Sequence, residues 1–319
     1  MSFPASYCIF VCLCLIGAGG LFAFSAVRRG QLKAALTGFM LALPLGYAAA
    51  KAGYLCFRFL PQLARWGASA LVLPRVDSFS FVCGCAGVTL ALTLGARMNR
   101  VKAGDILNAF APYGAALIAC FRMAELWLGT LGAGALLPNG HWAAGTFLAL
   151  PNSWGEWHWA VCVPEAAFAL FCAALAMTVW KRRDDRFARM VLCLCCGQML
   201  FELLRTNTAS WHFIRTEQLW CTVMLAAFSV TALVHSRRWL PLCLTVLLLA
   251  LNAYLQFALD KPELLTAVLP ASLHPWTEQN IKPVCYTGFI LTSVGLWLVA
   301  RQSLKGIYSP SLNIRTITS

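Results

Sequence analysis

The sequence predicts an all-α fold, a polytopic membrane helix bundle of about nine spans with its N-terminus outside and its C-terminus inside. Hydrophobic residues make up 60% of the 319 positions and charged residues only 12%, against about 25% charged residues in typical soluble domains. Several apolar runs approach or exceed the roughly 18 to 20 residues that cross a bilayer as a helix. In addition, Lys and Arg residues are concentrated in every second connection between these runs.

The apolar runs define nine predicted spans in chain order. The first, 8–27, follows a start without Lys or Arg and ends without a small-residue cleavage site, so we expect a retained span and not a removable signal peptide. The longest connection, 130–158, contains Gly, Pro, Asn and several Trp residues, which is typical of an interfacial loop and not of a folded domain. The other spans are predicted at 35–57, 79–96, 106–129, 159–180, 190–204, 218–235, 239–258 and 283–300.

The basic residues orient these spans. Sixteen of the 25 Lys and Arg residues fall in the connections after the first, third, fifth and seventh spans and after the last span, whereas seven fall in the opposite set. The remaining two, Lys51 and Arg122, lie within spans. Because cytoplasmic loops carry the excess of Lys and Arg, the N-terminus is predicted outside.

Net charge and cysteine content exclude two other classes of protein. The formal charge of +13 is explained by orientation in a membrane, so no nucleic-acid partner is expected. Nearly all of the 15 cysteines lie inside apolar runs, where they act as small polarizable hydrophobes. Because no His or carboxylate accompanies them at a zinc-like spacing, we expect no metal site and no cofactor.

Ionisable residues gather at one predicted depth. Lys51, Arg122 with Glu125, and Glu202 with Arg205 lie in the outer parts of three outward-running spans, and Glu165 lies in the first turn of an inward-running span. Such residues cost several kcal/mol in lipid unless they are paired or hydrated. Helical spacing places Arg122 beside Glu125, and Gln198, Glu202 and Arg205 on one face. A shared hydrated cavity is predicted, with isolated structural ion pairs or snorkelling side chains as the alternative.

A collinear set of motifs resembles the bacterial prolipoprotein diacylglyceryl transferases. Asp77-Ser-Phe-Ser-Phe-Val-Cys-Gly-Cys-Ala-Gly87, followed by basic residues 97–100, Ile106-Leu-Asn-Ala-Phe-Ala-Pro112 and Arg122, resembles the family's Ser-Phe-His-Gly-Gly-x-x-Gly signature, basic loop, Asp-x-x-Ala-Pro helix and Arg-x-Gly-Asn turn. Leu45-Gly-Tyr-Ala-Ala-Ala-Lys-Ala-Gly-Tyr54 is similar to the family's Gly-Gly-Arg-x-Gly-Tyr span. Val163-Pro-Glu-Ala-Ala-Phe168 and Gln198 to Arg205 are similar to its His-Pro and Arg-x-x-x-Glu-Phe-x-Arg segments.

The sequence departs from the family pattern at several positions. Val82 and Val163 stand where the family has histidines, Cys83 where it has the first signature Gly, and Gln198 where it has an Arg. The family's Asn falls at Glu125 if Arg122 is aligned without a gap, and a short deletion instead matches Glu125-Leu-Trp127 to the family's Glu-Leu-Trp. The resemblance covers about residues 8–238, so residues 1–238 are predicted to form a seven-span transferase-like domain and residues 239–319 two added spans with a cytoplasmic tail.

The resemblance implies transfer of a diacylglyceryl group from phosphatidylglycerol to a prolipoprotein cysteine, at the outer face of the bacterial cytoplasmic membrane. The implied partners are phosphatidylglycerol or another anionic phospholipid and the signal-peptide region of a prolipoprotein. It implies catalytic roles for Arg122, Glu125 and Glu202. It also implies substrate binding by residues that match the family's other motifs, which are Lys51, Tyr54, Gly87, Gln198 and Arg205.

Three alternatives remain open at the level of the sequence. A catalytically altered relative would bind phospholipid, or act on another acceptor, with the same residues. A small-molecule transporter is less favoured, because transporters place polar residues near the midplane and often repeat their halves. Within a transferase, the thiol of Cys83 is an alternative covalent nucleophile, because it stands beside the position of the family's histidine.

Overall fold

The chain is all-α, as predicted, and about 77% of it is helical. The computed structural model describes residues 3–69, 78–206, 210–211, 214–237, 239–261 and 274–308. Within these ranges eight helices are long and apolar enough to cross a membrane, and one further apolar helix is shorter. Asp77, where the first family-like motif begins, lies outside the described residues.

The helices group into two compact units. The first contains residues 1–190 and 201–209, and the second contains residues 191–200 and 210–319. Within the second unit, helix α8 (Thr216–Ser236) packs on α9 (Leu240–Asp260) and α11 (His274–Tyr308). The resemblance predicts that the transferase-like domain ends at residue 238. The division into two units does not test this boundary, which stays a prediction.

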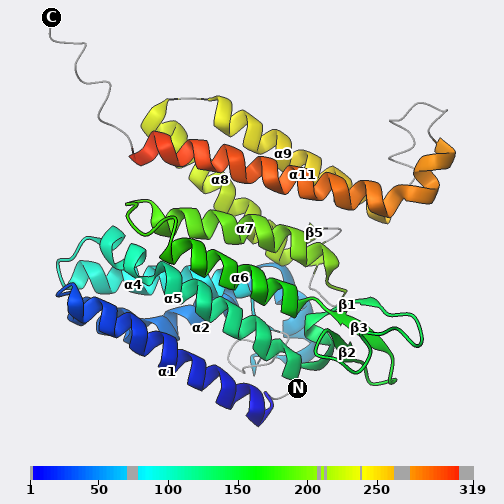
Figure 1. Cartoon of the computed structure of the whole chain (residues 1–319), viewed down its shortest axis with the longest axis horizontal. Helices are drawn as coiled ribbons and strands as arrows, with labels where there is room; N and C mark the ends of the chain where they lie inside the picture. The colour runs from blue at the N-terminus through cyan, green and yellow to red at the C-terminus, as the bar shows by residue number, and fades with distance from the viewer. Residues whose placement is uncertain are drawn as a thin grey trace, which may run out of the picture. The chain divides into compact units, whose positions relative to one another are not determined.

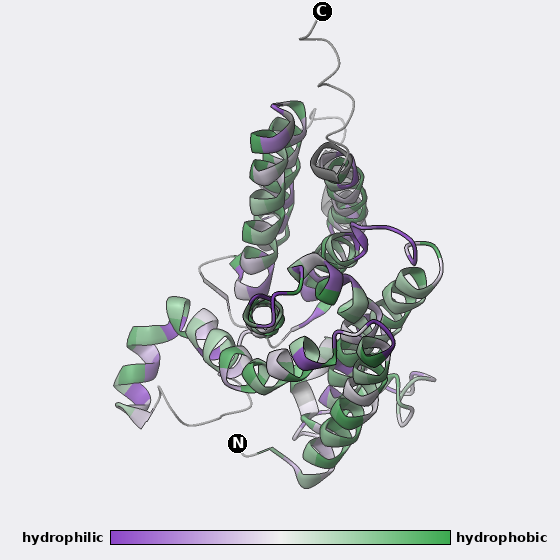
Figure 2. Cartoon of the chain, turned by 90° about the vertical axis from the view of Figure 1, so that its left-hand side faces the viewer, coloured by the Kyte–Doolittle hydropathy of each residue, from purple (hydrophilic) through white to green (hydrophobic). Residues whose placement is uncertain are grey.

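In the described part of the chain, the first unit contains five complete helices and the two ends of a sixth, which are drawn in Figure 1. Figure 2 shows that apolar residues dominate these helices, as expected where only a helix satisfies the backbone within a single segment. The central helix α5 contacts α1, α4 and α6, while α2 contacts α1 and α4. The helices are α1 (Ala5–Arg28), α2 (Leu32–Trp66), α4 (Phe81–Met98), α5 (Ala103–Ala124), α6 (Cys162–Met177) and α7 (Arg186–Leu204).

Glycines bring α2 and α4 unusually close together. A Cβ added at Gly95 would lie 2.5 Å from the backbone nitrogen of Gly38, and one added at Gly87 would lie 2.5 Å from the carbonyl oxygen of Leu45. A Cβ at Gly53 would overlap the side chain of Cys83. Small residues allow such close backbone approach between membrane helices. We call this contact between α2 and α4, made at Gly38, Gly53, Gly87 and Gly95, the glycine seam. It holds Lys51 of α2 beside the first residues of α4.

The predicted interfacial loop between the fourth and fifth spans contains regular structure. After the 3-10 helices η1 (Glu125–Trp127) and η2 (Gly129–Gly132), strands β1 (Ala133–Leu136), β2 (Ala149–Pro151) and β3 (Trp157–Ala160) form an antiparallel sheet in the order β1-β3-β2. Strand pairing provides hydrogen-bond partners for the backbone N–H and C=O groups of residues such as Ala149 and Ala160, which are almost completely buried. Consequently α6 begins at Cys162, three residues later than the predicted span.

Besides the middle of α7, the described residues of the second unit form three long helices and two short paired strands. Strands β4 (Ser210–Trp211) and β5 (Ile214–Arg215) lead into α8 (Thr216–Ser236), which is followed by α9 (Leu240–Asp260) and α11 (His274–Tyr308). Helix α11 leaves helical geometry at Asn280, shortly before a proline that cannot donate to the helix ladder. Its membrane-length part, Asn280–Leu304, begins there.

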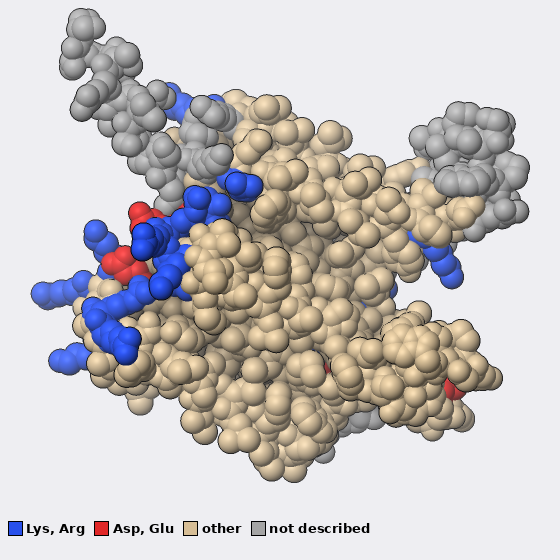
Figure 3. All heavy atoms as spheres, in the orientation of Figure 1, with Lys and Arg blue, Asp and Glu red and all other residues tan. Residues whose placement is uncertain are grey.

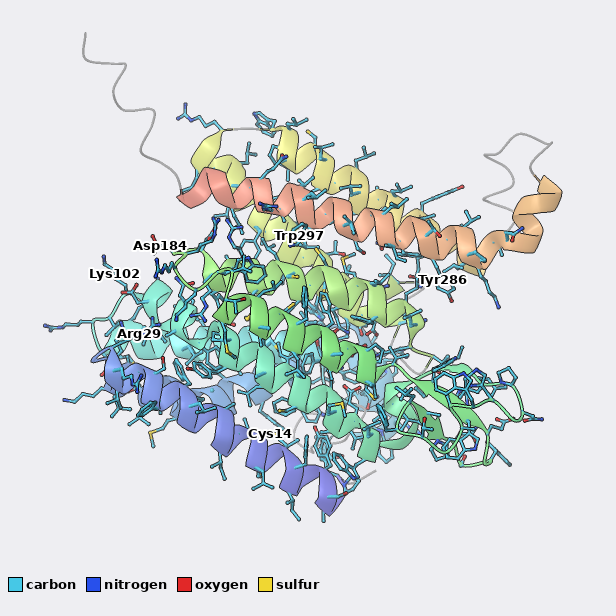
Figure 4. All side chains as sticks on the ribbon, viewed as in Figure 1. Cys14, Arg29, Lys102, Asp184, Tyr286 and Trp297 are labelled. Atoms are coloured by element: carbon cyan, nitrogen blue, oxygen red, sulfur yellow. The ribbon has the colours of Figure 1, made fainter. Side chains whose placement is uncertain are left out.

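Basic side chains concentrate at one end of the first unit. Figure 3 shows Lys and Arg gathered there, over the connections from α1 to α2, from α4 to α5 and from α6 to α7. Figure 4 places Arg29, Lys102 and Asp184, one from each connection, at this same end. The β-sheet follows the opposite end of α5 (Figure 1). This charge distribution is the one that the predicted orientation requires.

Candidate functional site

Two arginines and two glutamates form a closed charge cluster in the first unit. Arg122 binds Glu125 at 2.5 Å (Nη1 to Oε1) and Glu165 at 2.8 Å (Nε to Oε2). Arg205 donates from Nη2 to Glu125 Oε2 at 2.6 Å and to Glu165 through Nη2 and Nε at 2.6 and 2.7 Å. Each carboxylate therefore contacts both guanidinium groups, and the four residues together carry no net charge.

The cluster is assembled from the ends of three helices. Arg122 is in the last turn of α5, and the 3-10 turn that follows places Glu125 three residues later on the same side. Glu165 is in the first turn of α6, and Arg205 is the extended residue that ends α7. A further hydrogen bond from Arg205 Nη1 reaches the carbonyl of Leu131 at 3.2 Å. The segment that leads into β1 thus helps to hold the arginine in place.

The β-sheet anchors the residue that follows Arg205. The backbone nitrogen of Thr206 donates to the carbonyl of Ala133 at 3.0 Å, and its hydroxyl lies 3.2 Å from the carbonyls of Ala133 and Gly134. Because a Cβ at Gly134 would lie 2.8 Å from the carbonyl of Leu204, only a small residue permits this approach. The sheet therefore positions the end of α7 and with it Arg205.

A second group of contacts surrounds the start of α4. Lys51 Nζ donates to Ser78 Oγ at 2.9 Å and lies 5.2 Å from the ring centre of Phe79. The guanidinium of Arg122 lies 4.0 Å above the ring of Phe81, the first residue of α4. Ser80 caps the helix by accepting a hydrogen bond from the backbone nitrogen of Cys83. Two cations therefore contact the segment that carries the positive end of the α4 dipole.

These contacts account for most of the residues predicted to form a site. Arg122, Glu125 and Arg205 meet in the charge cluster, and Lys51 joins them through the start of α4. Glu202 is 2% exposed and lies one turn before Arg205 on α7. The other three predicted residues, which are Tyr54, Gly87 and Gln198, lie elsewhere.

The remaining predicted residues have identifiable structural surroundings. Tyr54 is buried on α2 and its hydroxyl accepts a hydrogen bond from Gln62 at 3.0 Å. Gly87 lies in the glycine seam, where packing alone requires a glycine. Gln198 is half-buried on the part of α7 that belongs to the second unit.

Glu165 is a cluster residue that the sequence predicted at the right depth but did not assign to the site. It is 4% exposed and is bonded to both arginines. The signal was its position in the first turn of a span, level with the other ionisable residues. What the sequence did not contain was the distance between α6 and the end of α7, because that distance depends on packing.

Among the residues that the structure describes, no three His, Cys, Asp or Glu side chains lie close enough to hold an ion. None of the 15 cysteines, all of which lie in the described ranges, forms a disulfide bond, and the side chain of Cys83 packs against Gly53.

Fold and site together define a polytopic, all-α membrane protein with a neutral, buried charge cluster at one end of its first unit. Comparison of the chain with family models, curated proteins and solved structures gives no match.

Proposed function

We propose that this chain is a phospholipid-dependent transferase that moves a diacylglyceryl group from phosphatidylglycerol to a prolipoprotein cysteine. The observation that supports it best is the start of α4, the segment that resembles the family's signature. Lys51 contacts one end of this segment and Arg122 the other, and both cations themselves come from family-like motifs. Two cations beside the positive end of a helix attract a phosphate and donate hydrogen bonds to its oxygens.

The charge cluster supplies further support, because it joins segments that are far apart in the sequence and that all carry the resemblance. Arg122, Glu165 and Arg205 come from three such segments and contact one another. In the proposed reaction the thiol sulfur forms a bond to the glyceryl carbon, the bond from that carbon to the phosphate oxygen breaks, and glycerol phosphate leaves. The reaction takes place at the outer face of the bacterial cytoplasmic membrane.

A carboxylate must accept the thiol proton. Glu125 and Glu165 are each engaged by two guanidinium groups, so their oxygens are already occupied as acceptors. We assign the base to Glu202, which is buried one turn from Arg205 and matches the glutamate of the family's Arg-x-x-x-Glu-Phe-x-Arg segment. Arg122 and Lys51 hold the phosphate, since Arg offers a bidentate fork and Lys a point charge. Arg205 contributes by orienting both cluster carboxylates.

A second candidate function is phospholipid binding without transfer, or with another acceptor. The closed cluster favours it, because a phosphate must compete with two carboxylates for the guanidinium of Arg122. The absence of imidazole at Val82 and Val163, both family histidine positions, favours it as well.

The two candidates are separated by an assay of purified protein with phosphatidylglycerol and a lipobox peptide. A transferase modifies the peptide, Arg122→Ala abolishes the product, and Arg122→Lys restores part of it. Because Arg122 is also structural, Lys51→Met provides a second test at the other end of the α4 start, and thermal unfolding shows which variants remain folded. Wild-type protein that binds phosphatidylglycerol without forming product supports the second candidate.

The same assay decides the role of the cysteines. Cys83→Ala and Cys85→Ala are expected to keep most of the activity, because these half-buried thiols lie along the α4 helix and Cys83 packs against Gly53. Loss of activity in Cys83→Ala at wild-type stability would instead assign the nucleophile to that thiol.

A further inference from the structure

The second unit contains a small cavity with an unusual lining. Its volume is about 70 Å³, enough for several water-sized groups. Four of its lining residues carry uncharged amide or hydroxyl groups and the rest are apolar. The lining residues are Met199, Ile214, Gln218, Leu219, Thr222, Leu249, Asn252, Ala253 and Gln256.

Three of the four polar residues of this cavity are buried, and one of their side-chain oxygens lacks a hydrogen-bond partner in the described part of the chain. Gln218 Nε2 donates to the carbonyl of Met199 at 3.1 Å, and Asn252 Nδ2 donates to Thr292 Oγ1 at 3.2 Å. Gln256 is 7% exposed, and its Oε1 has no hydrogen-bond partner among the residues that the structure describes. A buried amide oxygen without a donor costs about 1–3 kcal/mol. The cavity therefore offers an acceptor to a ligand that donates a hydrogen bond.

The lining also limits the charge of such a ligand. None of the nine lining residues is ionisable, so a phosphate or carboxylate would have no counter-charge and would be disfavoured. An uncharged ligand with an apolar body and a terminal hydroxyl group complements both the apolar and the polar residues of the lining.

The depth of the cavity points to the membrane interface. Gln218 is two residues from the start of α8, and Gln256 is four residues from the end of α9, so they lie roughly 3 and 6 Å inside these helix ends at 1.5 Å per residue. Thr222 and Asn252 lie roughly 9 and 12 Å inside by the same measure. Because α8 and α9 are each 21 residues long, about the thickness of the hydrocarbon core, the cavity lies at the outer edge of that core, where the hydroxyl of a weakly polar lipid reaches it.

We propose that this cavity binds the uncharged hydroxyl head of a membrane lipid, with Gln256 Oε1 accepting the hydroxyl hydrogen and Gln218, Thr222 and Asn252 completing the site. The site lies wholly within the second unit and does not rest on the proposed transfer reaction. The apolar residues Leu219 and Leu249 contact the first carbons of the lipid chain.

A photoactivatable monoacylglycerol in phosphatidylcholine nanodiscs tests the site. The full-length protein is expected to be labelled on peptides that contain residues 218–222 or 252–256. Gln256→Met, which keeps the size of the side chain, is expected to lower labelling roughly fivefold, the effect of one lost hydrogen bond. The matched control is Ser229→Ala, which removes a buried polar group on α8 that bonds Thr245 and not the cavity; its labelling is expected to equal that of wild type.

Competition with unlabelled compounds identifies the chemistry that is recognised. Monoacylglycerol is expected to displace the probe, whereas lysophosphatidic acid, which adds a phosphate, and a fatty-acid methyl ester, which lacks the hydroxyl, are not. Equal displacement by lysophosphatidic acid or by free glycerol would overturn the proposal of an uncharged lipid ligand. Labelling of Gln256→Met at the wild-type level, or no labelling of the wild type, would overturn the site itself.

Discussion

At the scale of single residues, the charge cluster is defined by how completely its members satisfy one another. Arg122 and Arg205 are 3% and 6% exposed, and each is opposed by the same two carboxylates. Burial of an ion pair contributes little net stability, but removal of one partner leaves an uncompensated charge. We therefore expect replacement of one arginine or glutamate of the cluster to destabilise the fold more than joint replacement of an oppositely charged pair.

Glu165→Gln tests this arrangement. The substitution leaves two guanidinium groups opposite one carboxylate, so we expect destabilisation by roughly 3–5 kcal/mol, read as a lower midpoint of denaturant unfolding in detergent. Glu156→Gln is the control, because Glu156 is an exposed carboxylate that bonds Asn152 in the β2–β3 turn. An unfolding midpoint of Glu165→Gln equal to that of the control would contradict a closed cluster.

A paired replacement gives the complementary prediction. Glu165→Leu with Arg205→Met removes one charge of each sign and leaves the contact between Arg122 and Glu125 in place. We expect this double variant to be more stable than the sum of the two single effects predicts, because the two charges that are removed oppose each other. The measurement is a double-mutant cycle of unfolding free energies, and simple additivity of the two single effects would refute the coupling.

At the scale of elements, the glycine seam explains how two helices place a lysine beside a helix start. Gly95→Ala is expected to cost about 1–3 kcal/mol as an overpacked contact, because the new Cβ would meet backbone atoms of Gly38 and Ala34 at 2.5–2.8 Å. Gly17→Ala in α1, where a Cβ meets nothing within 4 Å, is expected to be neutral or slightly stabilising. Thermal unfolding of the two variants in the same detergent measures the contrast, and equal midpoints would argue against the seam.

Helix boundaries are also decided at this scale. The apolar pattern predicted each of the nine apolar helices in the described ranges but extended the fifth to residues 159–180, whereas α6 spans Cys162–Met177. Residues 157–160 pair with β1 and β2 instead. An apolar run of this composition fits a strand as well as a helix, and only partners distant in sequence decide between them.

At the scale of the whole molecule, the orientation of the chain follows from its basic connections. Reporter fusions after Val27 and after Arg183 are expected to report cytoplasm, and a fusion at Gly140, in the β1–β2 connection, is expected to report the outside. The physical reason is the excess of Lys and Arg in cytoplasmic loops, seen in the basic end of the first unit (Figure 3). A cytoplasmic signal at Gly140 would refute this topology.

The sequence by itself determined the class of fold and the approximate spans, because hydropathy and helix length are local properties of the chain. It placed Arg122 beside Glu125, since residues three apart on a helix are neighbours. Only the tertiary structure decided that Glu165 joins Arg205, that Gly87 packs against Leu45 and that Gln256 faces a cavity. These contacts depend on how helices distant in sequence approach one another, and small residues and sheet pairing set those distances without leaving a periodic signal in the sequence.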